Sequence, residues 1–126
     1  MERLKGLSAV YVEDNAINVQ LMETIFEDID DASLAIATNG EDSIQVIADV
    51  MPDVILMDIG LPGMDGIETT AQLKSSETTR DIPVIAISAA AMNSDLQRAE
   101  SVGFFAYLTK PINIPDTLRT IILAMT

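Results

Sequence analysis

The 126-residue sequence contains no cysteine and no histidine. Without cysteine, the chain forms no disulfide bonds and has no thiolate for catalysis or metal binding. Without histidine, it lacks the side chain that proteins use most often as a general base and as a metal ligand. These two absences exclude thiol chemistry, and they exclude any function in which this chain itself carries a phosphohistidine.

Basic residues are also scarce, because seven lysines and arginines stand against 20 aspartates and glutamates, for a formal net charge of −13. Such a surface repels nucleic acids, so we expect no direct binding of DNA or RNA. No apolar run approaches the roughly 20 residues that span a bilayer, so we expect no membrane partner. The first residues show no signal peptide. We therefore expect a cytoplasmic location, as a separate protein or within a larger chain.

The length suits one compact domain over residues 1–126, and 48% of the residues are hydrophobic. Short apolar runs that favour strands alternate with segments of helical periodicity. The expected strands cover residues 8–12, 33–38, 54–57, 83–88 and 104–109. Helices are expected after Asn15 and over residues 43–50, 66–75, 92–101 and 114–125.

This alternation predicts an α/β fold with a parallel sheet and helices on both of its faces. The runs at 9–12, 54–57 and 84–87 are nearly all apolar, as strands covered on both faces should be. In such sheets the functional crevice lies beyond the carboxyl ends of the strands. The residues at those ends are therefore the candidates for function.

Charged and hydroxyl side chains occupy these strand ends: Glu13 and Asp14 follow the first strand, Asp58 the third, Ser88 ends the fourth, and Lys110 follows the fifth. Like-charged carboxylates at ~5 Å repel by about 3 kcal/mol per pair at an effective dielectric constant of ~20. Lys110 supplies one positive charge, and a hard divalent cation such as Mg²⁺ supplies two. The pattern predicts a cation site at this edge.

Each residue also has a simpler interpretation when it is taken alone. Glu13 and Asp14 are suited to the positive end of the first helix, and Asp58 is suited to starting a turn. Ser88 is suited to capping, and Lys110 to full solvation. Their joint placement at one edge of the sheet favours a site.

Four motifs carry a resemblance to a known family, and the spacings between them agree with it: 30 residues separate Asp58 from Ser88, and 22 separate Ser88 from Lys110. The sequence resembles the receiver domain of bacterial two-component response regulators over essentially its whole length. The motifs are VEDN at 12–15, VILMDIGLPGMDG at 54–66, AISA at 86–89 and AYLTKPI at 106–112.

The resemblance implies a flavodoxin-like, doubly wound (βα)5 fold with five parallel strands in the order 2-1-3-4-5. It implies that Asp58 accepts a phosphoryl group from a phosphohistidine and becomes an aspartyl phosphate. Glu13 (through water), Asp14, Asp58 and the backbone carbonyl of Gly60 would hold Mg²⁺ or Mn²⁺, and Lys110 would neutralise phosphoryl oxygens. The chain would catalyse only its own phosphorylation and dephosphorylation.

The resemblance also implies a switch. The Ser88 hydroxyl would bind a phosphoryl oxygen, and Tyr107 would then rotate inward, which changes the face formed by the fourth helix, fifth strand and fifth helix. The resemblance further implies a cis peptide bond before Pro111. This chain has serine where threonine is commoner, and Gly60 and Ala90 stand where many relatives carry longer polar side chains.

The expected phosphodonor is a histidine kinase or a histidine phosphotransfer protein, because EDNAINVQLM at 13–22 is similar to receivers of hybrid sensor kinases and phosphorelays. Ile17, Asn18 and Leu21 are the candidate docking residues for this donor. Phe105, beside Tyr107, is a candidate for docking the unknown downstream partner; the alternative is an isolated exposed apolar residue.

Three other functions remain as alternatives. Hydrolases and phosphatases with an aspartate nucleophile usually have a second aspartate two residues later, but Gly60 stands there. A flavin- or nucleotide-binding module needs a phosphate loop rich in glycine, serine and threonine after the first strand, where this chain has acids. The third alternative is a degenerate receiver that acts only as a protein-interaction module.

Overall fold

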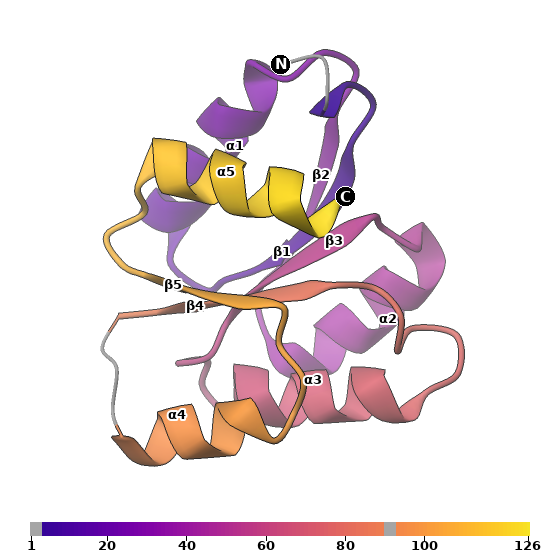
Figure 1. The fold of residues 1–126 in the computed structure, drawn as a ribbon, viewed down its shortest axis with the longest axis vertical. Helices are drawn as coiled ribbons and strands as arrows, with labels where there is room; N and C mark the ends of the chain where they lie inside the picture. Colours follow the sequence, from indigo (N-terminus) through magenta and orange to yellow (C-terminus); the bar gives the residue numbers. More distant parts are fainter. Residues whose placement is uncertain (1–3, 90–92) are drawn as a thin grey trace.

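The computed structural model describes residues 4–89 and 93–126, without the side chains of 93–96. Strands and helices alternate from one end to the other (Figure 1). The strands are β1 (Ser8–Val12), β2 (Ser33–Ala37), β3 (Val54–Asp58), β4 (Val84–Ser88) and β5 (Ala106–Thr109). The helices are α1 (Ala16–Glu27), α2 (Gly40–Val50), α3 (Gly66–Ser75), α4 (Asn93–Glu100) and α5 (Ile114–Ala124).

The strands form one parallel sheet in the order β2-β1-β3-β4-β5, which confirms the predicted fold class. Helices α1 and α5 cover one face, and α2, α3 and α4 cover the other (Figure 1). β3 lies in the middle of the sheet and is buried throughout. Its side chains alternate between the faces: Val54 and Leu56 pack toward α1 and α5, whereas Ile55 and Met57 pack toward α2 and α3.

Helix α2 differs from its prediction at its start and on its buried face. The Asn39-Gly40 pair indicated a turn before a helix at Ser43, but the Asn39 side chain accepts a hydrogen bond from Asp42 N at 2.7 Å and caps a helix that begins at Gly40. The prediction that Ala48 is buried was wrong. Ser43 and Ile47 are buried, Ile44 is partly buried, and Ala48 is exposed.

The other boundaries agree within two residues wherever the structure describes them. β4 and β5 begin one and two residues later than expected, at Val84 and Ala106. The expected start of the fourth helix at Met92 lies outside the described residues, as does Ala90. The expected apolar face of α5 is confirmed, because Ile121 is in the core and Leu118, Ile122 and Met125 pack against it.

Gly66 lets α3 begin directly against the end of β3. A Cβ atom built on Gly66 would lie 2.3 Å from the carbonyl oxygen of Asp58 and 2.7 Å from Cα of Ile59, both backbone atoms. Because backbone has little room to move, any side chain at this position would push the helix away from the strand end. Gly66 thus fixes the backbone that carries Asp58.

We expect Gly66→Ala to lower the free energy of unfolding by about 3 kcal/mol, at the upper end of the usual cost of overpacking. Urea denaturation measures the change. Gly60→Ala is the matched control from the same loop, because its Cβ would meet only Asp58 Oδ1, at 3.6 Å. Gly66→Ala protein as stable as the control would show that the close packing is unimportant.

Candidate functional site

The structure brings three of the predicted carboxylates together at the carboxyl end of the sheet. One oxygen from each of Glu13, Asp14 and Asp58 lies within 4.8 Å of the others. Asp14 is exposed, whereas Glu13 and Asp58 are 0% and 4% exposed. β1 and β3 are hydrogen-bonded neighbours, so residues just past their ends meet at the same edge.

Lys110 lies between two of these carboxylates. Its Nζ is 2.8 Å from Glu13 Oε1 and 3.1 Å from Asp58 Oδ2. Its backbone N–H donates to the carbonyl of Ser88 at 2.8 Å, and its peptide bond to Pro111 is cis. The simpler interpretation of Lys110 as a fully solvated lysine is therefore wrong.

Glu13 also accepts hydrogen bonds from its own segment. Tyr11 Oη donates to Glu13 Oε1 at 2.8 Å, and Asn15 N–H donates to Glu13 Oε2 at 3.3 Å. The cap of α1 is Asn15, whose side chain accepts from the N–H groups of Ile17 and Asn18. The buried carboxylate of Glu13 is therefore positioned by contacts within the site, and it does not cap α1. In the sequence, Tyr11 is one residue of an apolar strand, and no motif indicates a partner for its hydroxyl.

Asp58 makes a local bond as well as the contact with Lys110. Its Oδ1 accepts from Gly60 N–H at 2.9 Å, which confirms that Asp58 starts a turn. The same carboxyl also contacts Lys110 through Oδ2. A Cβ on Gly60 would be 3.6 Å from Asp58 Oδ1, so a side chain at position 60 would stand beside this carboxyl.

The loop after β3 is fixed by two elements that the sequence did not point to. Met64 N–H donates to Glu41 Oε1 of α2 at 3.0 Å. Asp65 caps α3 by accepting from Glu68 N–H at 2.9 Å, and its other oxygen lies 3.1 Å from Nη2 of Arg98 on α4. Glu41 and Arg98 looked like ordinary surface charges, and their contacts depend on the packing of helices.

Burial and the neighbouring charges shift the titration of this cluster. Burial raises the pKa of Asp58 to about 6, and Glu13 adds to the rise. Burial acts in the same direction on the pKa of Glu13, but hydrogen bonding to Asp58 when Asp58 is protonated, together with the bonds donated by Lys110 and Tyr11, outweighs it and holds that pKa below its ordinary value. Burial and Glu13 together raise the pKa of Tyr11, so its hydroxyl remains a donor at neutral pH.

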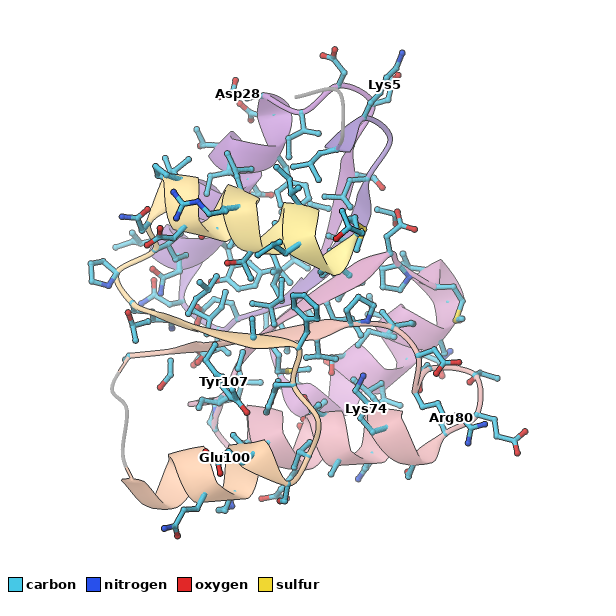
Figure 2. The ribbon with its side chains drawn as sticks, in the orientation of Figure 1. Lys5, Asp28, Lys74, Arg80, Glu100 and Tyr107 are labelled. Atoms are coloured by element: carbon cyan, nitrogen blue, oxygen red, sulfur yellow. The ribbon has the colours of Figure 1, made fainter. Side chains whose placement is uncertain are left out.

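The residues predicted to switch lie further along the same edge and on β5. Ser88 is half-buried at the end of β4, which pairs with β3. Tyr107 is 43% exposed and projects toward α4, on the side of Glu100 (Figure 2). Its ring lies 5.7 Å from that of Phe104, at an angle of 58°. Phe105 is 47% exposed.

The predicted docking residues of α1 sit next to the acidic pair. Ile17 is 76% exposed, and Asn18 and Leu21 are half-buried. Ile17 lies on the first turn of the helix, whose cap residue follows Asp14 directly. An apolar side chain therefore lies in solvent close to the carboxylates.

The cluster fits a divalent cation. Glu13, Asp14 and Asp58 offer hard oxygen ligands, and Lys110 balances only one of their three charges. A cation with two charges would neutralise the remainder, and carboxylate oxygens are the ligands that Mg²⁺ prefers. The donor set is therefore consistent with divalent metal binding.

Comparison with known proteins identifies this arrangement. Residues 9–122 match the family described as the response regulator receiver domain. The chain belongs to the response regulator receiver domain family. The polar-differentiation response regulator DivK of Brucella anthropi is 42% identical over 114 residues, which cover 90% of this chain and 92% of that protein.

Two solved structures of receiver domains also resemble the chain. The receiver domain of the sensor histidine kinase PA1611 from Pseudomonas aeruginosa, with a magnesium ion in its active site cleft, has a TM-score of 0.87 and 27% identity over 95% of this chain and 98% of that one. The signal receiver domain of a modulated diguanylate cyclase from Desulfovibrio desulfuricans has a TM-score of 0.83 and 31% identity over 94% and 93%.

The chain is therefore a receiver domain of two-component signalling, in a family that acts as a signalling switch. Receiver domains of this type interact with histidine kinases or phosphotransfer proteins and with downstream effectors. Within the described residues, every helix is too short or too polar to cross a bilayer.

We expect Asp58→Asn to stabilise the metal-free protein at pH 7.5. The pKa of Asp58 rises from 3.8 to about 6 on folding. The protonated carboxyl therefore contributes its full stability to the folded state below pH 3.8, and this contribution is lost as the pH rises through 6. This loss corresponds to on the order of 3 kcal/mol, which the uncharged asparagine avoids.

Calorimetric unfolding in EDTA at pH 7.5 and pH 4 measures the difference, which should shrink at the lower pH. Asp49→Asn makes the same chemical change at an exposed position on α2 and should show no such gain. A variant no more stable than wild type at pH 7.5 would contradict the prediction.

Proposed function

We propose that this receiver domain accepts a phosphoryl group on Asp58 from a phosphohistidine. The observation that supports this most strongly is the buried Asp58 carboxyl, with Lys110 Nζ at 3.1 Å and two further acids beside it. Phosphoryl transfer asks mainly for positioning and charge stabilisation, and this arrangement offers both. Asp58 needs no general base, because it is already ionised above pH 6.

In the proposed step, a carboxylate oxygen of Asp58 attacks phosphorus and forms a P–O bond. The P–N bond of the phosphohistidine breaks, and its electron pair stays on the imidazole of the donor. The Lys110 ammonium, 3.1 Å from Asp58 Oδ2, would stabilise the charge on the phosphoryl oxygens. Gly60 N–H holds Asp58 Oδ1, which limits the rotation of the carboxyl.

The proposal includes Mg²⁺ or Mn²⁺ held by Glu13, Asp14, Asp58 and the backbone carbonyl of Gly60. Such a cation neutralises charge on the carboxylates and on the incoming phosphoryl group. The three carboxylates of the cluster and their uncompensated charge support this cation.

Phosphorylation of Asp58 would add a group with about −1.5 to −2 charges and three acceptor oxygens. We propose that Ser88, one strand away, then turns its hydroxyl toward this group. Tyr107 is 43% exposed on the neighbouring strand β5, and we propose that it turns inward when Ser88 shifts. A downstream partner that contacts α4, β5 and α5, including Phe105, would sense the rearrangement as a shift between two populations.

The proposed donor is a histidine kinase or a histidine phosphotransfer protein that docks on α1 through Ile17, Asn18 and Leu21. The exposure of Ile17 next to the acidic cluster supports this surface. The proposal places the chain in the cytoplasm, where kinases that use ATP make phosphohistidine.

We expect incubation with Mg²⁺ and acetyl phosphate to add the mass of one phosphoryl group, because the buried carboxyl of Asp58 contacts Lys110 and lies beside Glu13 and Asp14. Asp58→Asn should abolish the added mass in intact-protein mass spectrometry. Asp49→Asn, an exposed aspartate on α2, should retain it. An unmodified wild-type protein would contradict the proposal and favour an interaction module that accepts no phosphate.

We expect Ile17→Ser to slow transfer from a phosphorylated histidine phosphotransfer protein by about tenfold, the effect of losing roughly 1.4 kcal/mol of docking energy. Phosphorylation by acetyl phosphate should be unchanged, since a small donor needs no docking surface. Val50→Ser removes another exposed apolar side chain, on α2, and serves as the control. Equal slowing with both donors would show that Ile17 supports the site and not the docking.

A further inference from the structure

Tyr11 places a hydroxyl group in an otherwise apolar strand. Its side chain is 0% exposed and packs in the core on the face of α1 and α5. Residues two apart on a strand point to the same side, so Tyr11 and Glu13 share this face. The hydroxyl donates to Glu13 Oε1 at 2.8 Å, which links the core directly to the acidic cluster.

The two oxygens of Glu13 have different surroundings. Oε1 receives both Tyr11 Oη and Lys110 Nζ, each at 2.8 Å. From the residues that the structure describes, Oε2 receives the longer bond from Asn15 N–H, at 3.3 Å. Because each carboxylate oxygen accepts about two hydrogen bonds, Oε1 is saturated and Oε2 keeps acceptor capacity.

We propose that Tyr11 is a positioning residue that orients the Glu13 carboxylate for the divalent cation and thereby sets the affinity of the site. This inference rests on the metal binding included in the proposed function. Tyr11 and Lys110 fix the plane of the carboxylate, so that Oε2 remains available to the cation or to water bound to it. Groups that orient a ligand in this way typically contribute 10- to 100-fold to metal affinity.

Packing alone does not account for the hydroxyl. Phenylalanine would fill the same space in the core, and an unpaired buried hydroxyl would be unfavourable by roughly 1–3 kcal/mol. The hydroxyl is tolerated because Glu13 accepts a hydrogen bond from it, and Glu13 is itself fully buried. The pair is therefore a connected polar unit whose outer member belongs to the cation site.

The test measures Mn²⁺ binding to the full chain, with electron paramagnetic resonance used to quantify the free ion. Tyr11→Phe keeps the ring and removes the donor, and we expect it to weaken Mn²⁺ binding about tenfold. Ile25→Val, in the same core cluster, loses only packing and should leave the affinity unchanged. The increase in unfolding temperature with Mg²⁺ should follow the same order.

Two further variants separate positioning from packing. Para-methylphenylalanine at position 11 replaces the hydroxyl by a methyl group of similar volume, and it should weaken Mn²⁺ binding as much as Tyr11→Phe does. In a Glu13→Gln background, Tyr11→Phe should have little additional effect, because its action passes through the carboxylate. Undiminished affinity in the para-methyl protein, or an equally large effect in the Glu13→Gln background, would overturn the inference.

The results distinguish this inference from the proposed function. A wild-type protein that binds neither Mn²⁺ nor Mg²⁺ overturns the metal site and the role of Tyr11 together. A wild-type protein that binds both ions, with an equal affinity in Tyr11→Phe, overturns only the role of Tyr11.

Discussion

The contact of one ammonium group with two buried carboxylates is the interaction on which the site depends. Lys110 Nζ lies 2.8 Å from Glu13 and 3.1 Å from Asp58, and Lys110 directly follows β5, which lies two strands away from β3. Parallel topology brings these ends together, and repulsion of about 3 kcal/mol per carboxylate pair would oppose their approach. Lys110 relieves part of that repulsion. The remainder is what makes the edge attractive to a divalent cation.

Much of this arrangement follows from the sequence, because an error of one or two residues in a strand boundary does not change which charged side chains follow the strand. The alternation of strands and helices along the chain, and the placement of Asp58 and Lys110 after strand-like runs, follow from periodicity and the rules for parallel sheets. The order of the strands within the sheet follows only from the resemblance to receiver domains. Tyr11 was not predictable in the same way. Within SAVYV it resembles any large strand residue, and its role appears only when the partner of its hydroxyl is known.

The helices show where local patterns give two answers. Asn39-Gly40 favours a turn and a helix cap equally, and the close approach of α2 to α3 settles the matter: a Cβ on Gly40 would lie 2.2 Å from Thr69 Oγ1. In α1, Ile17 and Ile25 lie on one apolar stripe, yet Ile25 is buried and Ile17 is not. Helical spacing predicts a face, but how far the sheet reaches under that face is a property of the whole fold.

The buried carboxylates also weigh against a purely structural role for the edge. The raised pKa of Asp58 means that folding opposes its ionisation, so the charged site lowers stability at neutral pH. A neutral side chain in place of Asp58 would relieve that strain, and a module that only binds other proteins has no need for the charge. Glu13 differs, because Tyr11 and Lys110 hold the pKa of this buried carboxyl below its ordinary value, so folding favours its charged form. The loss of stability occurs where acids, an ammonium group and an exposed apolar helix end meet. Such a local loss is expected of a reactive site.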